Sequence, residues 1–128
     1  NPVCCAAALA NIAYIERENL CGRAAEMGDY AMSLLRELQK QHALIGDVRG
    51  LGLMIGLELV RDEALTPAAA EAEAVRDACL RRGLLIGVGG YRGNVIRFQP
   101  PLVISRSQID QAVGILCDAL REAAAASP

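Results

Sequence analysis

Between residues 51 and 60 every second position is a large aliphatic residue, and this alternation constrains the fold more than any other feature. A period of two is typical of a β-strand that buries one face and leaves the other open. We therefore expect one face of a sheet to be covered and the opposite face to be bare. The predicted buried face comprises Leu51, Leu53, Ile55, Leu57 and Leu59.

Two shorter strands are predicted at residues 84–88 and 94–99, joined by a glycine-rich turn at residues 89–93. Pro100 and Pro101 end the second strand, because proline has no N–H to donate to a strand ladder. The two glycines of the first strand that face away from its leucines, Gly52 and Gly56, suggest a side-chain-poor strip where another backbone could dock.

Four segments are predicted to be helical. Asn1 and Pro2 indicate a helix start, and the run that follows, residues 3–15, is apolar nearly all round. Such a helix needs covering on more than one side, which indicates contact with another domain or subunit. Residues 22–42 carry a single apolar stripe from Ala24 to Leu38.

The other two helices are predicted from their end signals. Thr66 and Pro67 are expected to start the third helix, and Gly83 is expected to end it in a left-handed conformation. The sequence from Ser105 to Gln108 has the pattern of a capping box and is expected to open the last helix.

The resulting order, α-α-β-α-β-β-α, predicts one α/β (α+β) domain. We expect a small mixed sheet of three to four strands with helices mainly on one face, preceded by an N-terminal helix pair. The β-α-β portion predicts a right-handed crossover between parallel strands, to which the hairpin adds an antiparallel strand. The length of 128 residues fits such a domain.

Composition excludes several classes of function. The net charge is −2 and the arginines are dispersed, so neither nucleic acid nor a membrane surface is an expected partner. No apolar stretch approaches the roughly 20 residues of a membrane-spanning helix. The five cysteines form no C-x-x-C pair, so we expect small buried residues in a reducing compartment, the cytoplasm. These cysteines are Cys4, Cys5, Cys21, Cys79 and Cys117.

Arg97 is the residue whose position most suggests chemistry. Strand alternation places Ile96 and Phe98 on one face and Arg97 on the other, bare face. A guanidinium there can bind a carboxylate through two parallel hydrogen bonds. An ordinary surface or ion-paired arginine explains the same pattern, and on the residues alone this is the commoner case.

A complete catalytic apparatus is not found in the sequence. Its single lysine, Lys40, falls at a helix end outside the apolar stripe, where it is neither desolvated nor beside another cation, as a Schiff-base lysine must be. Its single histidine, His42, is expected at an exposed helix end. We expect no catalytic, cofactor-binding or metal-binding residue in this chain.

Three stretches together resemble the class III aminotransferases, which use pyridoxal phosphate and have fold type I. Residues 1–10 resemble the start of the helix that follows the cofactor-binding domain. Residues 46–58 are similar to the family motif G-D-V-R-G-x-G-L-M-x-G-x-E. Residues 94–102 match its strand that ends in an arginine with a Pro-Pro-Leu exit. The order and spacing agree over essentially the whole chain.

The resemblance implies that residues 1–128 are the C-terminal small domain of such an enzyme. Residues 1–20 would be the interdomain helix, and the cofactor-binding domain would lie upstream and be absent here. It also implies that Arg97 binds a substrate carboxylate. Pyridoxal phosphate is expected in the parent enzyme and not on this chain, which lacks the catalytic lysine and should be inactive alone.

The resemblance further implies a homodimeric parent enzyme that transfers an amino group to a 2-oxo acid. The donor is often an ω-amine, such as 4-aminobutyrate, ornithine or acetylornithine. Isomerases and other non-transferase members of the class stay compatible with the motifs. The alternative is a freestanding α/β module that binds a small ligand or oligomerises through its bare sheet face; it predicts a natural start codon close to Asn1.

Overall fold

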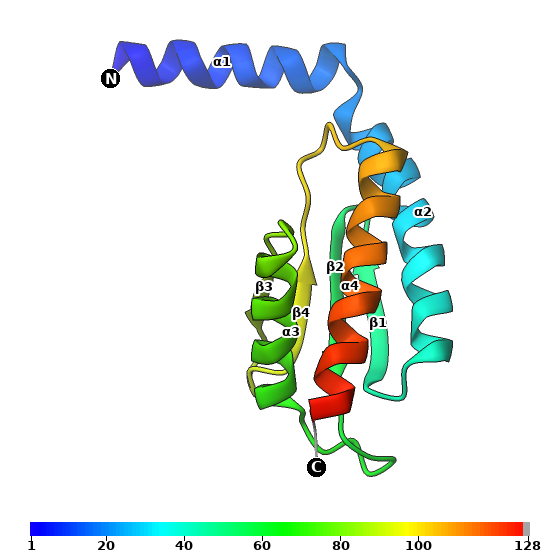
Figure 1. Cartoon of the computed structure of the whole chain (residues 1–128). Helices are drawn as coiled ribbons and strands as arrows, with labels where there is room; N and C mark the ends of the chain where they lie inside the picture. Colours follow the sequence, from blue (N-terminus) through cyan, green and yellow to red (C-terminus); the bar gives the residue numbers. More distant parts are fainter. Residues whose placement is uncertain (127–128) are drawn as a thin grey trace.

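The computed structural model describes residues 1–126, which form four helices and a four-stranded sheet (Figure 1). This confirms the predicted α/β class and the N-terminal helix pair. In chain order the elements are α1 (Pro2–Arg17), α2 (Leu20–Gln41), β1 (Ile45–Leu51), β2 (Met54–Leu59), α3 (Ala69–Arg81), β3 (Gly87–Gly89), β4 (Val95–Phe98) and α4 (Arg106–Ala126).

The single strand predicted at residues 51–60 is wrong in extent, because β1 and β2 form an antiparallel hairpin that reverses between Leu51 and Met54. Gly52 adopts a φ of 53°, a left-handed conformation that glycine reaches without steric cost. Leu51, predicted to be buried, is 90% exposed. The other four aliphatic residues of the pattern are buried: Leu53, Ile55, Leu57 and Leu59.

The strands lie in the order β1-β2-β4-β3, and every neighbouring pair is antiparallel. β2 and β3 run in the same direction, as a β-α-β unit requires, but β4 lies between them. The predicted parallel direction of the two strands is confirmed, but the predicted mixed sheet is wrong, because every pair of neighbouring strands is antiparallel. β3 is also shorter than the predicted strand 84–88, since pairing with β4 begins only at Gly87.

Helices α2, α3 and α4 cover one face of the sheet, and the core lies between the two layers (Figure 1). Leu57 of β2 and Ile96 of β4 are opposite each other in register, and both are 0% exposed. Leu35, Val75 and Leu116 contribute one fully buried side chain from each covering helix. The aliphatic face predicted from the alternation is thus the face that packs under helices.

The predicted starts of the first and last helices are confirmed. The Oδ1 atom of Asn1 accepts a hydrogen bond of 3.0 Å from the N–H of Val3. At the start of α4, the Ser105 N–H donates to Oε1 of Gln108 at 2.9 Å, and the Gln108 N–H donates to Oγ of Ser105 at 3.3 Å. These reciprocal bonds form the expected capping box.

The predicted start of the third helix is wrong. α3 begins at Ala69, and Pro67 lies before it in a bridge with Val60 at the end of β2. The tertiary pairing of this segment with the strand end overrides the local start signal. Gly83 follows α3 with a φ of 82°, which confirms the predicted left-handed terminator.

α1 extends away from the rest of the domain (Figure 1), and no residue along it is buried. Its large apolar side chains, such as Leu9 at 69%, are exposed. The described residues therefore do not supply the covering that this apolar helix was predicted to need. Asn19, with a φ of 46°, makes the bend between α1 and α2.

Within residues 1–126, no helix has the length and apolar character required to cross a bilayer.

α2 approaches the β1–β2 turn so closely that two glycines meet. A Cβ added at Gly28 would lie 2.3 Å from the carbonyl carbon and oxygen of Gly52. Since real Cβ atoms do not tolerate such a distance to backbone, the contact requires glycine at position 28. Gly52 was predicted to form part of a docking strip for another domain; instead it packs against α2 within this domain.

Replacing Gly28 with alanine should destabilise the fold by roughly 1–3 kcal/mol, the usual cost of overpacking a tight contact. Gly114→Ala is the matched control: Gly114 is an exposed glycine of α4 with nothing within 4 Å of an added Cβ. That change should stabilise by up to about 1 kcal/mol through helix propensity. Urea unfolding midpoints measure both changes, and equal effects of the two substitutions would contradict the packing argument.

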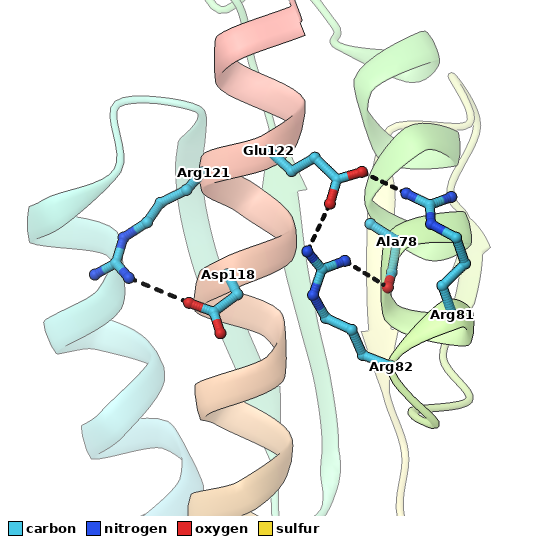
Figure 2. A network of polar contacts seen from close by, with 6 residues as sticks. All are labelled: Ala78, Arg81, Arg82, Asp118, Arg121 and Glu122. Atoms are coloured by element: carbon cyan, nitrogen blue, oxygen red, sulfur yellow. Dashed lines mark hydrogen bonds and ion pairs between the residues drawn. The ribbon is translucent and has the colours of Figure 1, made fainter.

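A polar network joins α3 to α4 at the surface (Figure 2). Glu122 of α4 receives hydrogen bonds from Arg81 and, at 2.6 Å, from Nη2 of Arg82. Arg82 also donates to the carbonyl oxygen of Ala78 at 3.0 Å. The hydrogen bond from Arg82 and the positive charges of both arginines lower the pKa of Glu122 below its usual 4.5. The network therefore favours the ionised carboxylate.

Because the pKa of Glu122 is lowered by folding, its contribution to stability is present above the unfolded pKa and is lost as the pH falls. Glu122→Gln should lower the unfolding midpoint at pH 7, and the difference from the unsubstituted protein should shrink steadily below about pH 4.5. Denaturant titrations from pH 7 to pH 3 measure this. Glu63→Gln is the control, since Glu63 makes no ion pair within residues 1–126. A constant difference for Glu122→Gln at all pH values would refute the linkage.

Candidate functional site

Arg97 lies in β4 with its side chain on the bare face of the sheet, as the strand alternation predicts. Its neighbours Ile96 and Phe98 are 0% and 3% exposed and point into the core, whereas Arg97 is exposed. In the part of the chain that the structure describes, the Arg97 guanidinium makes no hydrogen bond or ion pair. It is therefore free to bind an anion.

Glycines flank Arg97 on both neighbouring strands. Gly56 of β2 and Gly87 of β3 are its partners in the two ladders. A Cβ at Gly87 would lie 3.1 Å from Nη2 of Arg97, and a Cβ at Gly89 would lie 3.3 Å from Nε. The guanidinium consequently lies across the backbone of β3. The sequence indicated turn glycines here and did not reveal this role, because the register between β3 and β4 is a tertiary property.

A second arginine lies in the same row of the sheet but is neutralised. Arg49 of β1 pairs with Gly56, which in turn pairs with Arg97. Nη1 of Arg49 lies 2.7 Å from a carboxylate oxygen of Asp47 and 2.7 Å from one of Glu58. The hydrogen bonds that Arg49 donates to these two carboxylates raise the pKa of Arg49. Arg97, without such partners, is the cation of this row that can bind an external carboxylate.

A hollow of about 730 Å³ adjoins Arg97, and Arg97 forms part of its wall. It opens where residues 84–86 no longer pair with the chain beyond Phe98. The remaining wall is mostly apolar and includes Leu85, Ile86, Phe98, Pro100, Pro101 and Val103. We call this the Arg97 hollow. A cation beside an apolar wall suits a molecule that carries a carboxylate on an organic body.

Lys40 lies outside the Arg97 hollow and is engaged elsewhere. Its Nζ is 2.6 Å from a carboxylate oxygen of Glu37, and its side chain is 69% exposed. This confirms the prediction of a solvated, unactivated lysine. Across residues 1–126 no group of three or more side chains is arranged to hold a metal ion.

The single histidine is less exposed than predicted. His42 is half-buried between the end of α2 and α4, with Nε2 3.6 Å from Sγ of Cys117. Burial lowers the pKa of His42, and the positive charge of Arg121 lowers it further. His42 does not line the Arg97 hollow.

The prediction of small buried cysteines is wrong for three of the five. Cys4, Cys5 and Cys21 are exposed, because α1 packs against little of this domain and Cys21 faces outward at the start of α2. Cys79 is buried, which raises the pKa of its thiol to about 11 and makes it a poor nucleophile. All five thiols are free.

Comparisons with known proteins identify the family of this chain. The family model "Aminotransferase class-III" matches residues 1–120. Alanine–glyoxylate aminotransferase 2 homolog 2, mitochondrial, of Arabidopsis thaliana is 47% identical over 86% of this chain and 23% of its own length. Isoleucine 2-epimerase of Lentilactobacillus buchneri is 45% identical over 93% of this chain and 26% of its own length.

A solved aminotransferase structure from Bacillus anthracis has the same fold as this chain. It superposes with a TM-score of 0.91 at 41% identity, over 95% of this chain and 28% of the solved one. The chain thus spans about a quarter of the length of the relatives that it matches. From the family match over residues 1–120 and these two relatives, the chain belongs to the class III aminotransferases.

Proposed function

We propose that this chain is the substrate-carboxylate-binding small domain of an aminotransferase, and that Arg97 binds the carboxylate of amino-acid and 2-oxo-acid substrates. The observation that carries the proposal is the unpaired Arg97 guanidinium, which lies across Gly87 and Gly89 beside the Arg97 hollow. A planar guanidinium offers two parallel donors to a carboxylate, and the glycines leave the space above the strand open.

The family implies pyridoxal phosphate, and the residues described here do not fit it. The chain's single lysine is exposed and ion-paired with Glu37. The Arg97 hollow contains no lysine. We therefore place the cofactor on a further domain of the natural protein, with residues 1–20 as the interdomain helix. On this view residues 1–128 alone are inactive. The exposed apolar side chains of α1 support a docking role for that helix.

Transamination is the proposed reaction, and an ω-amino acid such as 4-aminobutyrate, ornithine or acetylornithine is the proposed donor. A homodimer in the cytoplasm is proposed for the natural protein. The similarity to an isoleucine 2-epimerase supports racemisation as a second candidate. Both reactions use amino acids with a carboxylate, so the proposed role of Arg97 is the same in each. Two incubations distinguish them: transamination converts 4-aminobutyrate and pyruvate to succinate semialdehyde and alanine, whereas epimerisation converts L-isoleucine alone to D-allo-isoleucine.

Replacing Arg97 with alanine in the natural protein should weaken the binding of carboxylate substrates by roughly 2–5 kcal/mol, the usual cost of removing one partner of a desolvated charge pair. Arg97→Lys should recover only part of this, because an ammonium cannot donate in a planar fork. Arg92→Ala is the control, since Arg92 is an exposed arginine of the β3–β4 turn without a polar partner in residues 1–126. An unchanged kcat/KM for every carboxylate substrate in Arg97→Ala would remove the assignment.

The natural protein should carry a visible chromophore that borohydride reduces and fixes to one lysine. Peptide mapping by mass spectrometry should find the label on a lysine outside residues 1–128 and leave Lys40 unlabelled. A label on Lys40 would contradict the proposed division between the two domains. A protein that begins near Asn1 and shows no chromophore would instead support the freestanding binding module.

A further inference from the structure

A segment without helix or strand connects β4 to α4 and forms one side of the Arg97 hollow. Pro100, Pro101, Val103 and Ile104 of this segment line the hollow. Pro100 and Leu102 also line a second hollow of about 470 Å³ beside the β1–β2 turn. The segment therefore separates the two spaces, and its position sets the width of the Arg97 hollow.

The backbone of this segment has few tethers of its own. Its two prolines have no N–H to donate. A hydrogen bond of 3.0 Å from the Ile104 N–H to the Pro101 carbonyl closes a turn within the segment. This bond shapes the turn but does not attach it to the rest of the domain.

Arg23 in the first turn of α2 supplies an attachment from 81 residues away. Its Nη2 donates to the carbonyl oxygen of Ile104 at 2.7 Å in a part-buried contact, and makes a longer contact of 3.4 Å with the carbonyl oxygen of Val103. Hydrogen bonds from a charged donor are shorter and stronger than neutral ones, so the shorter contact is the tighter of the two.

The Nε atom of Arg23 is buried and has no hydrogen-bond partner within the described residues. A buried donor without a partner costs free energy, which reduces what this arginine adds to overall stability. The polar contacts that Arg23 does make go to the backbone of residues 103–104.

We propose that Arg23 is a positioning residue of the Arg97 site: it fixes the wall at residues 100–104 against which the body of the carboxylate substrate packs. This inference rests on the proposed function of Arg97. When Arg23 is lost, the wall moves and the substrate is held less well, while the groups that carry out the reaction are untouched. The loss should therefore appear in KM and not in kcat.

Arg106 provides a matched control. Its Nη2 donates to Oε1 of Glu26 at 3.0 Å, so it also joins α4 to α2. Both side chains of that pair are exposed, at 60% and 64%, and neither lines the Arg97 hollow. Arg106→Gln thus removes a polar contact to α2 that comes from α4 and leaves the contact between Arg23 and residues 103–104 in place.

The test uses the natural protein with its cofactor bound, 4-aminobutyrate as the varied donor and pyruvate as the acceptor. Arg23→Gln should raise the KM for 4-aminobutyrate about tenfold with kcat within about twofold, since a contact that binds the ground state and the transition state equally affects KM and not kcat. Arg23→Lys, which keeps one charged donor, should recover part of the loss. Arg106→Gln should leave KM unchanged.

Hydrogen exchange provides a readout that does not depend on activity. The Ile104 amide, which donates to the Pro101 carbonyl at 3.0 Å, should exchange faster in Arg23→Gln and at the original rate in Arg106→Gln. Faster exchange with an unchanged KM, or an equal rise of KM in the two variants, would overturn the proposal. If Arg23→Gln does not fold, Arg23→Lys alone decides by the same two readouts. If Arg23→Gln raises KM but Arg97→Ala leaves kcat/KM unchanged, the proposed function of Arg97 is refuted instead.

Discussion

Leu57 and Ile96 lie opposite each other at the centre of the sheet, fully buried beneath the helices, and the rest of the domain depends on this pair. Burying one face of β2 and β4 gives the sheet a defined inside. Because side chains alternate along a strand, residue 97 must then project from the other face. The hydrophobic effect that holds the helices against the sheet thereby also orients a cation toward the open side. Core and candidate site are consequences of one constraint.

Of the two arginines in this row of the bare face, the neighbouring charges leave only one unpaired. Arg49 and Arg97 lie in the same row, separated by Gly56. Two carboxylates neutralise Arg49, which makes it part of the sheet's own ionic structure. Glycines, and not carboxylates, adjoin Arg97. The identity of the cross-strand neighbours, and not the residue type, therefore distinguishes the unpaired Arg97 from the ion-paired Arg49.

The domain attaches its functional segment through side chains from distant parts of the chain. The wall at residues 100–104 follows β4 directly, yet its attachment comes from Arg23 in α2. Asn94, just before β4, is a buried polar residue, and its Nδ2 donates to the carbonyl oxygen of Leu59 at 2.8 Å. A side-chain to backbone hydrogen bond thus holds the start of the strand that carries Arg97, and another holds the segment that follows the strand. A strand of four residues needs such support, since its own ladder is short.

The family membership and the open face of α1 fit together. α1 is apolar nearly all round, yet it has no buried residue in this chain. A covering domain would bury those apolar side chains. The chain spans about a quarter of the length of its relatives, and it carries Arg97, the proposed carboxylate-binding residue, without a lysine suited to the cofactor. In the proposed enzyme, recognition and chemistry are therefore divided between domains.

The sequence by itself determined the features that depend on local periodicity and local hydrogen bonding. The buried face of β2, the outward direction of Arg97, the capping box at Ser105 and the left-handed end at Gly83 all follow from residues within a few positions of each other. It did not reveal the turn at Gly52, because the aliphatic alternation continues through Leu53 and hides the reversal.

Only the tertiary structure decided which strands pair, that Gly87 and Gly89 lie beneath the Arg97 guanidinium, and that Arg23 reaches Ile104. These contacts join residues that are 8 to 81 positions apart in the sequence, and their geometry depends on how the strands pair and how the helices pack against the sheet. A period of two or 3.6 residues in the sequence shows which face of a strand or helix is buried, but not which distant residue it contacts. Tertiary packing therefore determined these contacts.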